Sequence, residues 1–221
     1  CQPKVLAYHN KTMFEHAGAS GGYLDKNYFP FCRGRIFDQF EFDEGQYDGK
    51  TEIFWATGAA LLIRSKLFHE VGGFDTAFFA HMEEIDLCWR LRKTGRAIGY
   101  LGEVTVYHLG GATLDRGSGK KLYLNIRNSL SMIYKNASLS GFLAIFLVKF
   151  LLEALASLGY LFSGKQDFAA AVWKGYLDFF KSIGVMKSQK VSNTHAPIGS
   201  GPVRLLFFNV KVLGKRKFSD L

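Results

Sequence analysis

The first half of the chain alternates hydrophobic and polar positions with short and changing periods. Residues 3–8 form an apolar run typical of a strand, whereas residues 8–48 are interrupted by glycine and proline and contain no long periodic element. Residues 53–64 are almost continuously apolar, which predicts a strand that is buried on both faces. A short helix over residues 65–71 should follow and end at the Gly72-Gly73 pair, because glycine readily adopts the left-handed backbone that stops a helix.

The centre of the chain carries one acidic amphipathic segment. Its helical pattern covers residues 82–93, and Gly95 follows closely. Two short strands are predicted after it, over residues 97–101 and 104–108, before the Gly110-Gly111 pair. An order of strand, helix, helix and strand is typical of the α/β class.

From about residue 120 onward the pattern is helical. Three helices are predicted, over residues 122–135, Leu139–Phe162 and residues 168–183. Residues 188–202 are polar and typical of a flexible linker, and the last stretch, residues 204–218, is short, basic and aromatic. We therefore expect an α/β region followed by a helical region and a tail.

The composition is that of a folded protein. Of 221 residues, 48% are hydrophobic and 15% are aromatic, which allows a sizeable core and is unlike a disordered chain. Three widely spaced cysteines, Cys1, Cys32 and Cys88, form neither a zinc pattern nor a disulfide framework. A reducing compartment fits this cysteine usage best.

The net charge of +9 is concentrated in the second half of the chain. Residues 1–119 carry 13 Lys and Arg against 15 Asp and Glu, whereas residues 120–221 carry 15 against 4. A basic and strongly apolar segment suits an anionic membrane surface. Nucleic acid is a poorer partner, because no groove-reading motif accompanies the charge.

The apolar segment Leu139–Phe162 is long enough to span a bilayer, which takes roughly 20 residues. Lys149, Glu153 and Ser157, however, recur every four residues and form a narrow polar stripe along the helix. The stripe argues against a lone transmembrane span and favours a helix that lies in the membrane plane. A helix packed on the globular domain or on a partner is the alternative.

Three carboxylates, Glu83, Glu84 and Asp86, crowd into four positions of the acidic helix. At about 100° per residue, Glu83 and Asp86 share a polar arc with Arg90, and Asp86 has the spacing of an ion pair with Arg90. Glu84 instead projects into the apolar arc, where an ionised carboxylate costs free energy unless a partner or a cleft receives it. Glu84 is therefore a candidate acid or base, with interaction with the helix dipole as the alternative for Glu83 and Glu84.

His108 ends the last predicted strand beside Gly110-Gly111, where the backbone can approach a ligand closely. Alone it is a weak signal, because a histidine in a strand is more often a core residue. His81 and Glu84 have the H-x-x-E spacing of a metal pair, but no second such motif supports a metal site there. The glycine cluster at residues 18–22 lacks the spacing of a phosphate-binding loop and is interpreted as part of an ordinary loop.

Four segments occur in an order and spacing that resemble one protein family. They are Trp55-Ala56-Thr57-Gly58-Ala59-Ala60, Gly73-Phe74-Asp75, Glu83-Glu84-Ile85-Asp86-Leu87-Cys88-Trp89-Arg90 and Val106-Tyr107-His108-Leu109-Gly110-Gly111. Together they look like the C-terminal half of a bacterial family 2 glycosyltransferase with the GT-A fold, and Asn125-Ile126-Arg127-Asn128 extends the likeness. On this basis we predict a partial, Rossmann-like GT-A domain in residues 1–121, a basic, membrane-associating helical region in residues 122–187, and a linker with a tail in residues 188–221.

The resemblance implies an inverting transfer of a sugar from a nucleotide-diphosphate donor to an acceptor hydroxyl in cell-envelope glycan assembly. The acceptor would be a glycan or a lipid-linked sugar. In that family the base is usually the second acid of a Glu-Asp pair, a position that Glu84 occupies here, with Glu83 and Asp86 beside it in the catalytic motif. Glutamate is one methylene longer than aspartate, so the carboxylate must retract or the acceptor must sit differently.

The resemblance also implies a cofactor and a binding surface. His108 matches the position that in many relatives helps hold a divalent cation, Mn²⁺ or Mg²⁺, on the donor diphosphate. Thr57, Gly58 and Ala59 resemble the turn at which the backbone approaches the sugar and the acceptor. Trp55 is expected either to stack on a sugar ring or to lie in the core.

Asp75 and Arg127 complete the expected substrate-binding set. Asp75 belongs to the Gly73-Phe74-Asp75 motif, and Arg127 is similar in location to basic residues that contact the diphosphate. A solvated charge on a helix is the alternative for Arg127.

The family's nucleotide-binding half, with its metal-binding Asp-x-Asp, has no counterpart in these 221 residues. We therefore expect an incomplete enzyme whose missing half precedes Cys1, acting as a peripheral protein at the cytoplasmic face of the inner membrane. The competing hypothesis is a non-catalytic membrane-associating module in which the α/β half is a scaffold.

Overall fold

The computed structural model describes residues 1–110, 118–188 and 205–221. Contacts within the chain divide it into two compact units. The β-rich unit contains residues 1–73 and 87–110 together with the tail, and the helical unit contains Phe74–Asp86 together with residues 118–188. The boundary between the units therefore falls inside helix α2 (Glu83–Lys93), after its fourth residue.

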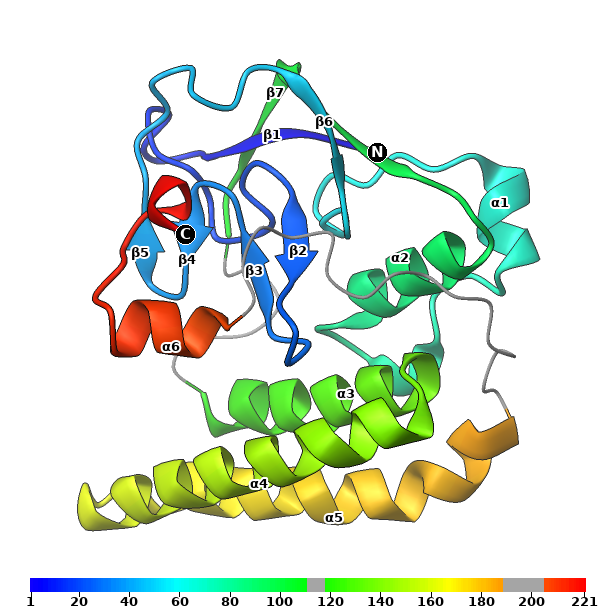
Figure 1. Ribbon diagram of the computed structural model, residues 1–221, viewed down its shortest axis with the longest axis vertical. Coiled ribbons are helices and arrows are strands. Elements are labelled where there is room, and N and C mark those ends of the chain that lie inside the picture. The colour runs from blue at the N-terminus through cyan, green and yellow to red at the C-terminus, as the bar shows by residue number, and fades with distance from the viewer. Residues whose placement is uncertain (111–117, 189–204) are drawn as a thin grey trace. The chain divides into compact units, whose positions relative to one another are not determined.

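The β-rich unit is built on a three-stranded mixed sheet with the strand order β1-β7-β6 (Figure 1). β1 (Gln2–Ala7) runs parallel to β7 (Ile98–His108), and β6 (Lys50–Ile53) runs antiparallel to β7. Parallel strands this far apart in the sequence require a long connection, which here includes helices. The predicted α/β class is therefore confirmed.

β7 is a single strand of 11 residues where the sequence pattern predicted two. The predicted break fell at Gly102, since glycine often interrupts a strand. In the structure, a Cβ on Gly102 would lie 2.3 Å from the carbonyl oxygen of Tyr47, so the glycine admits a neighbouring backbone without ending the strand. The irregularity lies instead in the pairing with β1, whose register shifts between Pro3 and Lys4.

Residues 8–48, predicted as a loop, contain four short strands. They form one antiparallel sheet in sequence order: β2 (Gly22–Leu24), β3 (Pro30–Cys32), β4 (Arg35–Ile36) and β5 (Gln39–Phe40). Strands of two or three residues are too short to show a period of two, which is why the sequence pattern missed them. Tyr23, Phe31 and Ile36 of these strands are buried in the core of the unit.

The predicted strand over residues 53–64 is wrong. β6 ends at Ile53, and the chain turns after Thr57. The hydroxyl oxygen of Thr57 accepts a hydrogen bond from the N–H of Ala59 at 3.2 Å, and its carbonyl accepts one from the N–H of Ala60 at 3.2 Å. These local bonds replace the ladder that a continuous strand would need.

Helix α1 (Ser65–Glu70) ends at the predicted glycine pair. The N–H of Gly73 donates to the carbonyl of Phe68 at 2.8 Å, and the N–H of Gly72 donates to the carbonyl of His69 at 3.0 Å. Both glycines have positive φ. This is the Schellman arrangement, which satisfies the last carbonyls of a helix.

The second half of α2 packs into the core of the β-rich unit. The ring of Trp89 lies 5.3 Å from that of Tyr28 and 5.6 Å from that of Phe54, measured between centroids. Leu87 and Cys88 are fully buried on the same helix. Burying side chains of this size stabilises the fold by roughly 1.5–3 kcal/mol each.

The helical unit consists of three long helices that lie side by side (Figure 1), with α5 packed on both others. They are α3 (Gly119–Asn136), α4 (Leu139–Phe162) and α5 (Gln166–Ser188), so all three predicted helices are confirmed. Ser118 and Ser138 cap the first two by accepting backbone N–H groups. Phe142 of α4 meets Phe179 of α5 in the centre of the unit.

The C-terminal tail is folded onto the β-rich unit. It contains α6 (Leu206–Lys211) and a short 3-10 turn, η2 (Phe218–Asp220). The N–H of Leu206 donates to a carboxylate oxygen of Asp25 at 2.9 Å, and the N–H of Phe218 donates to Glu41 at 3.0 Å. Most of the predicted flexible linker lies outside the described residues.

Candidate active site

The loop over residues 74–82, which we call the α2 loop, leads into α2 and is strained. It begins with a 3-10 turn, η1 (Thr76–Phe78). Phe79 has φ 63° and ψ −58°, and the N–H of Ala80 donates to the carbonyl two residues earlier at 2.8 Å, which defines a γ-turn of the rare type. Positive φ recurs at the two residues after Ala80, at 70° and 73°. Such conformations cost about 1–3 kcal/mol each, so the surrounding structure must hold the loop.

Asn128 of α3 holds the α2 loop from its buried side. Its side-chain amide donates to the carbonyls of Phe78, Ala80 and His81 at 2.9, 2.7 and 2.8 Å. Asn128 is only 1% exposed, so these carbonyls have little access to water as substitute partners. The two N–H groups of this amide are therefore shared among three backbone acceptors of a strained segment.

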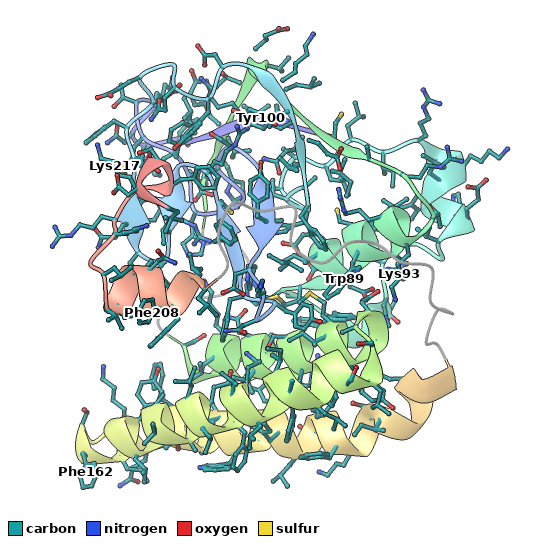
Figure 2. All side chains as sticks on the ribbon, viewed as in Figure 1. Trp89, Lys93, Tyr100, Phe162, Phe208 and Lys217 are labelled. Atoms are coloured by element: carbon teal, nitrogen blue, oxygen red, sulfur yellow. The ribbon has the colours of Figure 1, made fainter. Side chains whose placement is uncertain are left out.

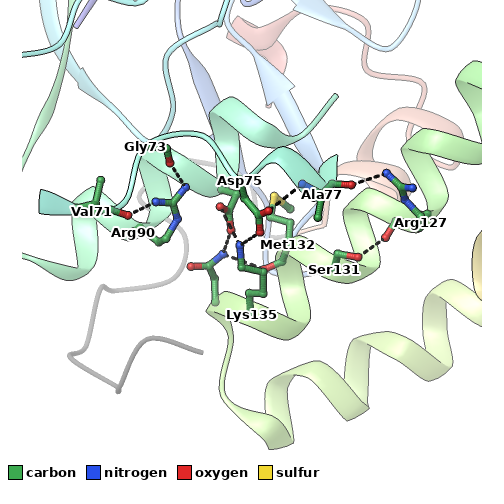
Figure 3. A network of polar contacts seen from close by, with 11 residues as sticks. Val71, Gly73, Asp75, Ala77, Arg90, Arg127, Ser131, Met132 and Lys135 are labelled. Atoms are coloured by element: carbon green, nitrogen blue, oxygen red, sulfur yellow. Dashed lines mark hydrogen bonds and ion pairs between the residues drawn. The ribbon is translucent and has the colours of Figure 1, made fainter. Parts of the chain in front are cut away.

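Arg127 holds the same loop from the next position of α3. Its guanidinium donates to the carbonyl of Ala77 at 2.8 Å (Figure 3) and to that of Phe78 at 3.0 Å. Arg127 is therefore not simply a solvated charge on a helix. Its expected contact with a diphosphate stays a prediction.

Lys135 joins the α2 loop to the start of α2 (Figure 3). Its ammonium lies 2.7 Å from Asp75 and 3.3 Å from Asp86, and the amide of Asn136 donates to the other oxygen of Asp86 at 2.7 Å. Asp75 also accepts the N–H of Ala77 at 2.9 Å. Asp75 and Asp86, expected in substrate binding and in catalysis, thus have structural partners inside the helical unit.

The polar arc predicted on α2 is buried rather than solvated. Asp86 is fully buried, and Arg90 and Lys93 are nearly so. Within the β-rich unit, the guanidinium of Arg90 donates to the carbonyls of Val71 and Gly73 (Figure 3), the latter at 2.8 Å. These contacts tie α2 to the end of α1.

Glu83 and Glu84 begin α2, and each has one carboxylate oxygen that is buried without a hydrogen-bond partner in the described part of the chain. Burial, and then the neighbouring Glu83 carboxylate, raises the pKa of Glu84 to about 7, and burial also raises the pKa of Glu83. Interaction with the helix dipole alone would lower both pKa values. A carboxyl that exchanges its proton near neutral pH has the property required of a general base.

His81 adds a third polar atom of this kind at the same end of α2. Its Nε2 is buried and has no hydrogen-bond partner among the described residues. Burial, and then the charge of Lys121, lowers the pKa of His81 and so favours the neutral ring. Buried polar atoms without partners are rare in folded proteins. Their concentration before and within the first turn of α2 marks this position as the candidate reaction site.

A cavity of about 380 Å³ lies beside the α2 loop, inside the helical unit. Its polar lining comes from the loop, α3 and α5, and includes Asp75, Arg127, Asn128, Asp178 and Lys181. The volume is within the range of small-molecule pockets. Glu84 does not line it, so this cavity is a neighbour of the candidate base rather than its pocket.

Trp55 lies in the core of the β-rich unit. It is 5% exposed, and its indole N–H donates to the carbonyl of Tyr23 at 3.0 Å. A Cβ on Gly22 would lie 2.0 Å from the indole ring, so the glycine is required for this packing. Of the two expectations for Trp55, the core position is the one that the structure shows.

Thr57, Gly58 and Ala59 form an exposed turn held at one end. Thr57 is buried, and its N–H donates to the side-chain oxygen of Gln2 at 2.8 Å, whereas Gly58 and Ala59 are exposed. A Cβ on Gly18 would lie 2.4 Å from Thr57, which explains part of the glycine cluster by packing. The turn has the open backbone expected for ligand contact, and that contact stays a prediction.

His108 ends β7 and is paired with a carboxylate that the sequence pattern did not reveal. Its Nδ1 lies 3.1 Å from Oε2 of Glu15, which is nearly fully buried, while His108 is half-exposed. A carboxylate accepts hydrogen bonds, so Nδ1 is the donor in this contact. Metal-binding histidines are usually oriented by such a partner. Gly110 has φ 69°, and Gly111 lies outside the described residues.

The side chains around His108 provide only part of a binding site for a divalent cation. Within residues 1–110, 118–188 and 205–221, no group of three or more His, Cys, Asp or Glu side chains is arranged to hold a metal ion. The pair of His108 and Glu15 therefore fits one ligand of such an ion and not a complete coordination sphere.

Asn128, Lys135 and Asn136 were not predicted as site residues. They recur after seven and eight positions along the buried side of a helix that also carries large apolar residues, with Leu130 and Ile133 between them. Polar residues repeated on an apolar face are a usable signal. No comparable signal existed for Glu15, which meets His108 across 93 residues of sequence.

Comparison with known proteins shows similarity over about a quarter of the chain, and no family model matches the chain. A stretch of 56 residues is 43% identical to an N-acetylglucosaminyl-diphospho-decaprenol L-rhamnosyltransferase of Mycobacterium tuberculosis (strain H37Rv), covering 25% of this chain and 18% of that protein. A stretch of 58 residues is 36% identical to the rhamnosyltransferase WbbL of Escherichia coli (strain K12), covering 26% of this chain and 22% of that protein. The match thus spans about a fifth of either relative, and local similarity to glycosyltransferases is confirmed.

Proposed function

We propose that this chain is the acceptor-side part of an inverting, family 2-like glycosyltransferase of cell-envelope glycan assembly, with Glu84 as its general base. The observation that carries the proposal is the buried oxygen of Glu84 at the start of α2, which has no hydrogen-bond partner among the described residues, together with the pKa of this carboxyl, which burial raises to about 7. The local similarity to two rhamnosyltransferases supports the class of reaction.

In the proposed reaction, Glu84 takes the proton of an acceptor hydroxyl while the hydroxyl oxygen attacks C1 of the donor sugar. The bond from C1 to the diphosphate oxygen breaks, and the nucleoside diphosphate leaves with that electron pair. Attack from the side opposite the leaving group inverts the configuration at C1. The proton then passes from the Glu84 carboxyl to solvent, which a pKa near 7 permits.

The strained α2 loop gives Glu84 a fixed position in this proposal. Asn128 holds three carbonyls of the loop, and Lys135 holds Asp75 and Asp86 on either side of it. A catalytic carboxylate gains efficiency when its supporting residues are rigid, because no free energy is spent on arranging it during the reaction.

The names of the two relatives suggest the substrates. We take as the first candidates a nucleoside-diphosphate rhamnose donor and a polyprenyl-diphosphate-linked N-acetylglucosamine acceptor, used at the cytoplasmic face of the inner membrane. The exposed turn at Gly58 and Ala59 is the proposed contact for sugar. A divalent cation, Mn²⁺ or Mg²⁺, with His108 as one ligand oriented by Glu15, would neutralise charge on the leaving diphosphate when bound.

The test is transfer by the complete protein with this donor and acceptor. Glu84→Gln should lower the turnover rate by about 10²–10⁴, the usual contribution of a general base. Glu70→Gln, which makes the same change at an exposed acid of α1, should leave the rate unchanged.

Retained turnover in Glu84→Gln would exclude Glu84 as the base. A calorimetric titration of nucleoside diphosphate with Mn²⁺ tests whether the donor-binding site needs residues outside this chain. Binding by the complete protein but not by the 221-residue chain supports an incomplete glycosyltransferase, whereas binding by neither favours a non-catalytic module.

A further inference from the structure

The two sides of α4 are inverted relative to a helix of a water-soluble protein. Its polar stripe faces inward: Lys149 and Ser157 are 4% and 1% exposed. Its outward side carries large apolar residues every three or four positions, namely Leu139, Leu143, Leu147, Leu151, Leu155, Leu158 and Phe162. Phe162, at the end of α4 (Figure 2), is 90% exposed. We call this side the outer face of α4.

The two charged residues of the inward polar stripe, Lys149 and Glu153, have partners inside the helical unit. Lys149 pairs with Glu153 at 2.9 Å, and the hydroxyl of Tyr176 on α5 donates to Glu153 at 2.6 Å. The stripe therefore no longer opposes contact of α4 with lipid, because its charges are turned away from the outer face.

α5 continues the apolar surface. Trp173, Leu177 and Phe180 are all substantially exposed and recur on one side of α5. The ring of Trp173 lies 5.9 Å from that of Phe150, and the ring of Phe180 lies 5.8 Å from that of Phe146, so this stripe adjoins α4. The outer face of α4 and the stripe of α5 form one apolar surface on a single rigid pair of helices.

A charged border runs along the other exposed side of α5. Lys174 and Lys181 are both well exposed and pair with Asp178 between them, at 2.6 and 3.2 Å. Residues 118–188 carry nine Lys and Arg against three Asp and Glu. A wide apolar face with a basic border complements an anionic bilayer, whose headgroups meet the lysines while the acyl boundary receives the leucines.

We propose that the outer face of α4 and the Trp173-Leu177-Phe180 stripe of α5 lie in the surface of an anionic lipid bilayer, with both helices parallel to the membrane. Among the described helices, only α4 is long and apolar enough to cross a membrane, with mean hydropathy 2.0. An in-plane position is chosen because crossing would carry Lys174, Asp178 and Lys181, in the middle of α5, into hydrocarbon. The proposal is independent of the reaction proposed for Glu84.

The test is co-sedimentation of the full 221-residue chain with vesicles of phosphatidylcholine alone and of phosphatidylcholine mixed equally with phosphatidylglycerol. The chain should sediment with the mixed vesicles. Leu147→Gln/Leu151→Gln, on the outer face, should weaken this binding at least about tenfold, because two leucines that enter the bilayer surface are lost. Leu62→Gln/Leu109→Gln, a matched pair of exposed leucines in the β-rich unit, should bind like the parent chain.

Two further measurements keep the outcome decisive. The thermal midpoint of the outer-face variant should equal that of the parent, which excludes misfolding as the cause of lost binding. Lys174→Glu/Lys181→Glu should weaken binding to the mixed vesicles more than to phosphatidylcholine. Unchanged binding of the outer-face variant, or a parent chain that stays in the supernatant with both vesicles, overturns the proposal. A dimer of the parent that the outer-face variant turns into a monomer overturns it too, in favour of a second copy.

Discussion

α3 and α4 are neighbouring helices of one unit, both begun by a serine cap, and they use their apolar side chains in opposite ways. α3 buries Leu130 and Ile133 and adds buried polar groups that reach another segment, the α2 loop. α4 buries its polar stripe and exposes its leucines. The burial pattern of α3 is explained by contacts within the protein, whereas the exposed leucines of α4 call for a partner outside it.

The largest effect is expected from Lys135, the charged centre of the α3 contacts. Lys135→Met should lower the free energy of unfolding by about 3–5 kcal/mol, because the fully buried Asp86 and the partly exposed Asp75 both lose their contact with the ammonium of Lys135. Urea denaturation of the full chain measures this loss. Adding Asp86→Asn should recover part of it, since the buried negative charge next to the lost ammonium is then removed. A loss below about 1 kcal/mol, the usual value for an exposed pair, would contradict the network.

Asn128→Ala should have the next largest effect. The carbonyls of Ala80 and His81 lose the Asn128 donor, whereas that of Phe78 keeps Arg127, and such a loss costs about 1–3 kcal/mol of stability. In the complete protein, kcat should fall while KM changes little, because the loop positions Glu84 and not the donor. Ser129→Ala is the control, since the hydroxyl of Ser129 donates to the carbonyl of Ile126 in its own helix. Equal stability of the two variants would remove Asn128 from this role.

Glu84→Gln tests the pKa of Glu84 through stability. The folded pKa of about 7 lies above the ordinary 4.5, so between these values the folded state binds the proton more tightly than the unfolded state. The contribution of the protonated Glu84 carboxyl to the free energy of unfolding is complete below pH 4.5 and is lost as the pH rises through 7. Glu84→Gln should therefore equal the parent near pH 4.5 and exceed it by about 1–2 kcal/mol near pH 8, allowing for partial exposure. Urea denaturation of the variant and the parent at both pH values measures this difference in the free energy of unfolding. A difference that is the same at both pH values would contradict the raised pKa.

The smallest effect is expected on the outer face of α4. Leu151→Ala should change the stability of the chain in water by less than about 0.5 kcal/mol, because the side chain is already exposed. Leu130→Ala, the same substitution on the buried side of α3, should cost about 2–5 kcal/mol. Comparable losses in the two variants would show that the outer face is buried in solution.

The sequence by itself determined the features that depend on neighbouring residues. Periodicity and flanking glycines located α1, α2 and the three long helices, and the α/β order followed from them. Spacing alone revealed the polar stripe of α4, whereas the special role of Glu84 that its angular position suggests stays a prediction. All of these depend on contacts within one or two helical turns, which a linear pattern contains.

Only the tertiary structure decided the features that join distant segments. It placed Trp55 in the core, paired His108 with Glu15, and brought Asn128 to the carbonyls of the α2 loop. It also divided the apolar run after β6 with a turn and joined two predicted strands into β7. These outcomes depend on packing and hydrogen bonds between residues tens of positions apart, whose free energies exceed local preference and leave no periodic mark in the sequence.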